Sequence, residues 1–209
     1  MARIWDISQT LRAGLPVWPG DTAFEIERTW ALEGDCPVNV SKLTLSTHSG
    51  AHGDAPLHYD ADGDAIDAVD LAVYCGPCRL IDARHAKGAI EAKDVSPSLY
   101  ARCERVLFRT YDTFPRDRWD SDFTAISADL IKKMALAGVK LVGTDAASLD
   151  PEDSKTLDAH NAVRRAGMRI LEGLVFDGVP DGDYELIALP LKIAGADAAP
   201  VRAILRELP

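Results

Sequence analysis

Basic residues are scarce in this sequence, and they do not gather anywhere along it. The 209 residues include 23 Lys and Arg against 33 Asp and Glu, which gives a formal net charge of -10. A protein that binds nucleic acid needs a basic surface to neutralise phosphates, and anionic membranes attract polybasic segments. The composition therefore argues against both partners, and we interpret the acidic charge as an aid to solubility.

Long apolar runs are also missing. No stretch approaches the ~20 apolar residues of a membrane-spanning helix. The segment MARIWDISQTLRAG at the start has neither the apolar core nor the small-residue cleavage site of a signal peptide. We therefore expect a cytoplasmic protein whose four cysteines are thiols. Cys75 and Cys78 have the spacing of a redox or zinc pair, but no second pair accompanies them, so we expect a structural role.

Several common signatures are absent as well. The sequence contains no GxSxG segment, which marks the nucleophile of many serine hydrolases, and no GxxxxGK[ST] phosphate-binding loop. It also lacks repeats, low-complexity segments and linkers, so residues 1–209 are expected to form a single domain. With 47% hydrophobic residues, this length suffices for one sizeable core.

Short apolar runs bounded by Gly, Pro or Asp predict many strands. Leu43 and Leu45 alternate with polar neighbours, as on a half-buried strand. Many strands with few, scattered helices favour an α+β (mixed β/α) fold over a regular doubly wound sheet. The predicted strands are Arg3–Ser8, Phe24–Trp30, Val40–Thr47, Cys78–Ala83, Arg105–Arg109, Lys140–Gly143, Tyr184–Ile193 and Val201–Leu205.

One helix is clearly marked. Ser127 is a good N-cap for a helix over Ala128–Ala137, and Gly138 is a good stop. A second helix is predicted near Thr156–Ala166, and Asp94–Tyr100 is predicted to form a short helical turn.

Histidine is scarce, yet three of the five histidines lie in the segment HSGAHGDAPLH, residues 48–58. These are His48, His52 and His58, with Asp54 among them. Imidazole and carboxylate groups are common ligands of zinc and similar ions. A surface loop with incidental histidines explains this concentration poorly, so we predict a metal site.

Glycine and proline shape the same segment. Gly50, Gly53 and Pro56 argue against a helix, although His48 and His52 are four residues apart. We expect a strand to end near residue 47 and to run into a glycine-rich loop, in which tight backbone turns let the side chains converge.

Other candidate residues lie downstream. Glu172 interrupts the apolar run Ile170–Phe176, where an acid is costly to bury unless it is paired or metal-bound; a solvent-facing acid at a strand end is an equal alternative. His160, taken alone, fits a surface or helix-cap position. His85 is expected in a solvated loop, and Asp145 is a strand-end or turn residue to which we assign no catalysis.

The segment 48–58 resembles the signature HxGTHxDxPxH of the cyclase-like metal hydrolase family. Every defining His, Gly, Asp and Pro is present, and the one departure is Ala51 in place of threonine, which affects loop packing more than metal binding. Within this family, the flanking segments resemble the branch that hydrolyses N-formyl-L-kynurenine. Those segments are WDIS at 5–8, PVWPGD at 16–21, GTD at 143–145, ILEGL at 170–174, LPLKI at 189–193 and GAD at 195–197.

The resemblance implies a barrel-like mixed β/α domain, usually a homodimer, with two divalent metal ions per subunit. The metal is normally Zn²⁺, with Mn²⁺ as an alternative. By this analogy His48, His52 and Asp54 bind the first ion, Asp54 and His160 bind the second, and Glu172 serves both.

The implied reaction is hydrolysis of N-formyl-L-kynurenine to L-kynurenine and formate, in tryptophan degradation, by a metal-activated water. His58 is then the catalytic proton donor and acceptor rather than a ligand. Trp18 lines the substrate pocket of its own or a neighbouring subunit; without the resemblance, a surface-capping role is favoured. Two alternatives stay open: a related hydrolase that acts on a cyclic amide such as isatin, and a non-catalytic metal-binding protein.

Overall fold

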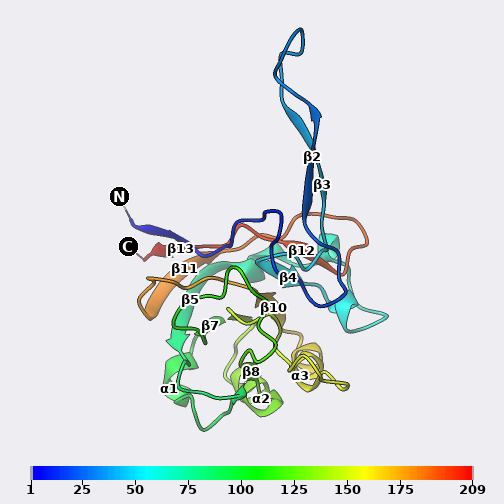
Figure 1. The fold of residues 1–209 in the computed structure, drawn as a ribbon. Coiled ribbons are helices and arrows are strands. Elements are labelled where there is room, and N and C mark those ends of the chain that lie inside the picture. Colours follow the sequence, from blue (N-terminus) through cyan, green and yellow to red (C-terminus); the bar gives the residue numbers. More distant parts are fainter. Residues whose placement is uncertain (1, 209) are drawn as a thin grey trace.

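A nine-stranded mixed sheet forms the framework of the molecule, which the computed structural model describes for residues 2–208. The sheet curls around the helices α1 to α3 (Figure 1). The predicted α+β fold, with a barrel-like mixed sheet and few helices, is therefore confirmed. In spatial order the strands are β1 (Ile4–Asp6), β13 (Ile204–Glu207), β11 (Gly182–Ile187), β5 (Cys75–Asp82), β7 (Arg105–Arg109), β9 (Leu141–Thr144), β10 (Arg169–Glu172), β4 (His52–Asp54) and β12 (Ala198–Pro200).

The centre of the sheet is parallel and covered on both faces. Strands β5, β7, β9 and β10 run parallel, and β9 is completely buried. Because side chains alternate along a strand, Ile170 and Leu171 of β10 point to opposite faces and join two different hydrophobic cores. Near-continuous Val, Ile and Leu in these strands are what such two-sided burial requires.

The helices agree with the sequence prediction. Helix α2 (Ala128–Leu136) begins after Ser127, whose hydroxyl accepts a hydrogen bond from the Leu130 N–H. The other two are α3 (Asp158–Ala166) and the single turn α1 (Pro97–Tyr100). Among residues 2–208, every helix is too short or too polar to cross a membrane.

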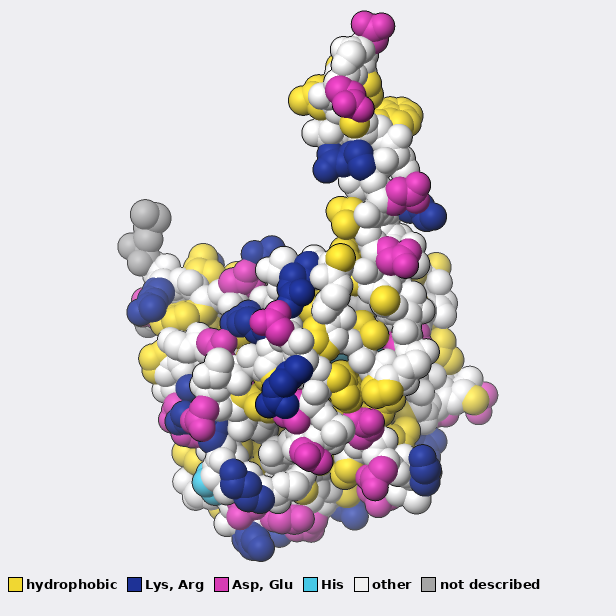
Figure 2. All heavy atoms as spheres, viewed as in Figure 1, with side chains coloured by type: hydrophobic (Ala, Val, Ile, Leu, Met, Phe, Trp, Pro, Cys, Tyr) yellow, Lys and Arg dark blue, Asp and Glu magenta, His cyan; other side chains and the backbone are white. Residues whose placement is uncertain are grey.

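Strands β2 (Glu25–Trp30) and β3 (Val40–Thr44) form a separate hairpin that projects away from the body of the molecule (Figure 1). All residues of both strands are exposed. The predicted half-buried strand is wrong here, because nothing in the described chain covers the apolar face: Leu43 is 52% exposed, and its cross-strand partner Ile26 is 57% exposed. Apolar side chains are visible along this arm in Figure 2.

Some strands differ from the prediction. The segment expected to be a glycine-rich loop contains β4, because β10 and β12 pair with its two edges. Strands β10 and β12 were not predicted, and the strand predicted to reach Ile193 ends at Ile187. The remaining short elements are β6 (Ala89–Ile90), β8 (Ala125–Ile126), η1 (Pro56–His58), η2 (Ile66–Ala68) and η3 (Leu71–Tyr74).

Candidate active site

Strand β4 places two candidate ligands on one face of the sheet. His52 and Asp54 are two residues apart, so their side chains point the same way, and both are buried. The antiparallel register sets Glu172 of β10 opposite His52. As a result His52 Nε2 lies 3.5 Å from Asp54 Oδ1 and 3.5 Å from Glu172 Oε2.

Two more histidines approach from outside β4. His48, in the turn before β4, has its Nδ1 3.3 Å from Asp54 Oδ1. His160, on the buried side of α3, has its Nε2 3.5 Å from Asp54 Oδ2 and 3.6 Å from Glu172 Oε1. In each carboxylate, Asp54 and Glu172, one oxygen therefore faces His52 and the other faces His160.

The chemistry of this donor set fits metal ions. His52 Nε2 and both carboxylate oxygens of Asp54 are buried and have no hydrogen-bond partner among the described residues. Such atoms are costly to bury unless another interaction satisfies them. Ligand atoms about 2.0–2.1 Å from a tetrahedral zinc lie about 3.4 Å apart, which matches the donor separations of 3.3–3.6 Å.

A second set of contacts orients the histidines. His160 Nδ1 lies 2.7 Å from Asp150 Oδ2, and His52 Nδ1 lies 2.9 Å from the carbonyl oxygen of Gly50. Because a carbonyl oxygen can only accept, the Nδ1 of His52 carries the proton and its Nε2 is free to coordinate. Asp150 also accepts hydrogen bonds from the backbone N–H groups of residues 159 and 160. The same carboxylate therefore caps the start of α3 and fixes the imidazole of His160. Leu149 donates its N–H to Glu172 Oε1 at 2.8 Å.

His58 lies at the edge of the cluster, at the end of η1. Its side chain is 32% exposed, and its Nδ1 is 3.5 Å from Asp197 Oδ2. Asp197 accepts hydrogen bonds from Thr47 Oγ1 and His48 Nε2, both at 3.0 Å. Sequence reasoning gave Asp197 no role, and its position in the segment GAD was the only signal for it.

The proximity of these groups changes their acidity. Burial alone lowers the pKa of His48, but the nearby carboxylate of Asp54 and the hydrogen-bonded carboxylate of Asp197 outweigh it and raise the pKa to about 9. Burial likewise lowers the pKa of His160, while Asp150 and Asp54 raise it to about 10. Burial raises the pKa of Asp54, but the histidines hold it well below its usual value. Metal binding would therefore displace protons from the cluster.

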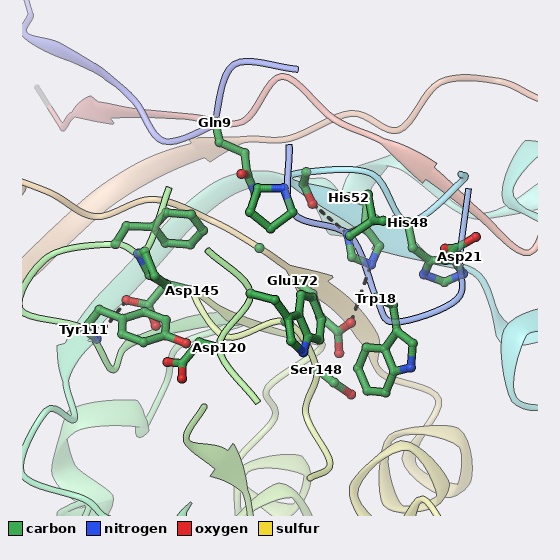
Figure 3. Close-up of a pocket in the computed structure, with 18 of the residues that line it drawn as sticks. Gln9, Trp18, Asp21, His48, His52, Tyr111, Asp120, Asp145, Ser148 and Glu172 are labelled. Atoms are coloured by element: carbon green, nitrogen blue, oxygen red, sulfur yellow. Dashed lines mark hydrogen bonds and ion pairs between the residues drawn. The ribbon is translucent and has the colours of Figure 1, made fainter. Parts of the chain in front are cut away.

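A cavity of about 340 Å³ opens beside the cluster (Figure 3). Its size suits a small-molecule site. Trp18, which the sequence analysis singled out, lies on its wall in the same subunit and is 36% exposed. Its ring packs edge-on against Trp119, with 5.4 Å between centroids. Other apolar wall residues are Pro16, Val17, Phe114 and Pro115.

Asp145 is a buried residue of the same cavity that sequence reasoning left without a function. Its carboxylate accepts hydrogen bonds from the backbone N–H and hydroxyl of Thr110 and from the N–H of Tyr111. Burial raises its pKa to about 6, although these hydrogen bonds oppose the shift. Asp145 thus fixes the start of the loop after β7. His85 is exposed, as predicted.

The sequence matches proteins of known name over its whole length. The family model Cyclase, described as "Putative cyclase", matches residues 5–151. The chain is 63% identical over 209 residues to a kynurenine formamidase of Maricaulis maris (strain MCS10), with 100% of both chains covered. It is 60% identical over 208 residues to a kynurenine formamidase of Sphingopyxis alaskensis (strain DSM 13593 / LMG 18877 / RB2256), again with 100% of both covered.

Solved structures share the fold. One described as "The Structure Of Potential Metal-Dependent Hydrolase With Cyclase Activity" is 28% identical, with a TM-score of 0.84 and 100% of each chain covered. Isatin hydrolase A from Labrenzia aggregata, bound to benzyl benzoate, is 23% identical, with a TM-score of 0.83 and coverage of 99% of this chain and 94% of that one. The second likeness concerns the fold alone.

The raised pKa values predict how the chelated protein responds to pH. His48 and His160 have ordinary pKa values of 6.5, raised to about 9 and about 10 in the folded protein. Their stabilisation is complete below pH 6.5 and is lost as the pH rises through 9 to 10. We expect the free energy of unfolding, measured by urea titration in chelator, to fall across this range.

The metal-loaded protein is the control, because its ligating imidazoles are already neutral and do not titrate in this range. In chelator, the variant His160→Gln should show a shallower fall than the wild type. A chelated wild type whose stability rises over the same range would contradict the prediction.

Proposed function

This chain belongs to the Cyclase family, and from that premise we propose that it hydrolyses N-formyl-L-kynurenine to L-kynurenine and formate. The observation that carries the proposal is the cluster of histidines and buried carboxylates at one side of a cavity with aromatic walls. The full-length relatives at 63% and 60% identity, both named kynurenine formamidase, support the choice of substrate. The chain is a metal-dependent amide hydrolase.

We propose that the cluster holds two divalent ions, with zinc as the resident metal. His48, His52 and Asp54 would hold the first ion, Asp54 and His160 the second, and Glu172 would serve both. The two oxygens of each carboxylate face different histidines, which supports this division. Imidazole and carboxylate donors without thiolate also suit manganese. When bound, such ions act as Lewis acids that make water more acidic and polarise a carbonyl group.

The chain's own residues handle the proton. Hydrolysis breaks the bond between the formyl carbon and the aryl nitrogen, and that nitrogen must gain a proton because an amide anion is a poor leaving group. His58 lines the cavity, lies next to the cluster and is partly exposed, so it is suited to give and take protons there. Asp197, 3.5 Å from His58 Nδ1, would orient the imidazole. Trp18 would stack on the aryl ring of the substrate.

The alternative substrate is a cyclic amide such as isatin. Isatin contains the same kind of bond, between a carbonyl carbon and a nitrogen attached to an aryl ring, and an isatin hydrolase shares the fold. We expect the purified protein to turn over N-formyl-L-kynurenine at least 100-fold faster than isatin, as measured by the release of formate and by ring opening.

We expect metal analysis to give two ions per chain, and chelation to abolish turnover until metal is restored.

Faster hydrolysis of isatin would contradict the substrate, whereas full activity without metal would contradict the mechanism. A content of one ion per chain would contradict the division of ligands.

His58 is the residue whose proposed role is easiest to isolate. We expect His58→Ala to lower kcat by about 10²- to 10⁴-fold, the usual contribution of a general acid or base, while the metal content stays unchanged. The matched control is His85→Ala, which removes an exposed histidine outside the cavity. Loss of metal in His58→Ala would mean that His58 is a ligand.

We also propose that the chain forms a homodimer through the hairpin β2–β3. A two-stranded hairpin is marginally stable alone, and this one presents Ile26, Trp30 and Leu43 to solvent. A second copy of the chain carries an identical arm and body, so a two-fold axis could cover both arms at once. The cytoplasmic location stays a prediction.

The arm can be tested directly. We expect the double variant Ile26→Ser/Leu43→Ser, which removes two facing apolar side chains, to shift the sedimentation coefficient from dimer to monomer. Leu136→Ser is the control, because Leu136 is 90% exposed on the body of the molecule. A wild type that sediments as a monomer, or a double variant that remains dimeric, would contradict the proposal.

A further inference from the structure

The cavity has a second polar end, away from the histidine cluster. Tyr111, Asp120 and Arg118 line it there. In Figure 3, Tyr111 and Asp120 lie on the opposite side of Glu172 from His48. These residues belong to the loop after β7, not to the sheet that carries the cluster.

Asp120 is the acid most available to a ligand at this end. Its side chain is 19% exposed, and the only described ion pair it makes is a long one, 3.9 Å from Arg118 Nη1. Burial and the nearby charge of Asp120 raise the pKa of the Tyr111 hydroxyl, which keeps that hydroxyl protonated and able to donate. Asp145 also lines the cavity, but its oxygens already accept bonds from Thr110 and Tyr111.

Arg118 is the least engaged basic residue of its loop. Its neighbour Arg116 bonds to Asp177 Oδ2 at 2.7 Å, and the preceding Asp117 is paired with Arg12. Among the described residues the one ion pair of Arg118 is with Asp120, at 3.9 Å, and its side chain is 72% exposed. Its guanidinium therefore keeps its donors free for a carboxylate at the cavity mouth.

We infer that Asp120 and Arg118 recognise the zwitterionic amino-acid tail of the substrate, with Asp120 binding the ammonium group and Arg118 the carboxylate. The inference rests on the proposed function. An α-amino acid carries its ammonium and carboxylate groups on the same carbon. Its complement is therefore a neighbouring pair of opposite charges, such as Asp120 and Arg118. Besides Asp120, Asp145 and Glu172, the lining contains one more acid, Asp21, which lies at the end of the cavity near His48 (Figure 3).

The shape of the substrate fits this division. In N-formyl-L-kynurenine the formamide and the ketone that begins the tail are on adjacent ring carbons. The α-carbon, which bears the ammonium and carboxylate groups, is two bonds beyond the ketone carbon. With the formyl group at the histidine cluster, the ring would lie along Trp18 and Phe114, and the tail would point toward the loop. Asp120 and Arg118 would then set specificity without touching the reacting bond.

Four substrates separate the two contacts. They are N-formyl-L-kynurenine, its analogue without the carboxylate, its analogue without the ammonium group, and N-(2-acetylphenyl)formamide, which lacks both. We expect Arg118→Met to raise KM by roughly five- to twentyfold for the two substrates that carry the carboxylate. We expect Asp120→Asn to do the same for the two that carry the ammonium group. In both variants kcat should change little, because the contacts are remote from the reacting bond.

Arg116→Met and Asp122→Asn are the matched controls, since both residues are exposed, lie in the same loop and do not line the cavity. The inference is overturned if the variants affect all four substrates equally, or if neither variant changes KM for N-formyl-L-kynurenine; the proposed function survives either result. A wild-type protein that hydrolyses none of the four would instead refute the proposed function, and the inference with it.

Discussion

The buried carboxylate of Asp54 is the constraint around which the site is built. Asp54 is completely inaccessible to solvent, and neither oxygen has a hydrogen-bond partner among the described residues. An isolated charge in such a place would be prohibitively costly. Nitrogen atoms of three histidines lie within 3.5 Å of it, on both sides. The fold therefore tolerates Asp54 only as part of a cluster that contains positive charge, whether protons or metal ions supply it.

The sheet makes this cluster possible because β4 directs its ligand side chains to one face and its packing residue to the other. His52 and Asp54 occupy one face, and Gly53 between them turns to the other, where an added Cβ would lie 3.4 Å from Leu171 and Tyr74. The turn after β10 is more tightly packed. Gly173 has a φ of +62°, and a Cβ there would lie 2.5 Å from the carbonyl oxygen of Gly50. At Gly173 the two backbones approach too closely for a side chain, whereas a Cβ at Gly53 would meet its neighbours at ordinary contact distance; the pairing of β10 with β4 sets Glu172 opposite His52.

The sequence predicted those parts of the site that are local and could not predict the rest. His48, His52 and Asp54 stood out because scarce histidines are crowded into one segment. Glu172 and His160 are far from that segment, and only the family resemblance linked them to it. Asp150 carries no signal among 33 acidic residues, and Asp197 and Asp145 stand out only through the segments GAD and GTD of the family resemblance. Strand β4 was missed because three residues with a central glycine resemble a loop until distant strands pair with them. The alternation around Leu43 predicts a half-buried strand, but alternation does not reveal whether a partner surface exists.

The two ends of the cavity rest on different kinds of structure, and this bears on how substrate choice is made. The histidine cluster is held by β4, β10 and α3, whose backbones are buried and mutually paired, so its geometry is difficult to alter without disturbing the core. Tyr111, Asp120 and Arg118 lie on a loop that is tied to the rest of the molecule by hydrogen bonds to the side chains of Asp145, Asp177 and Glu152. Loops accept substitution more readily than paired strands. A change of substrate can therefore occur in the loop while the chemistry of the sheet stays the same. Asp145 links the loop to the sheet. It directly follows β9, which pairs with β10, and its carboxylate accepts hydrogen bonds from the first residues of the loop.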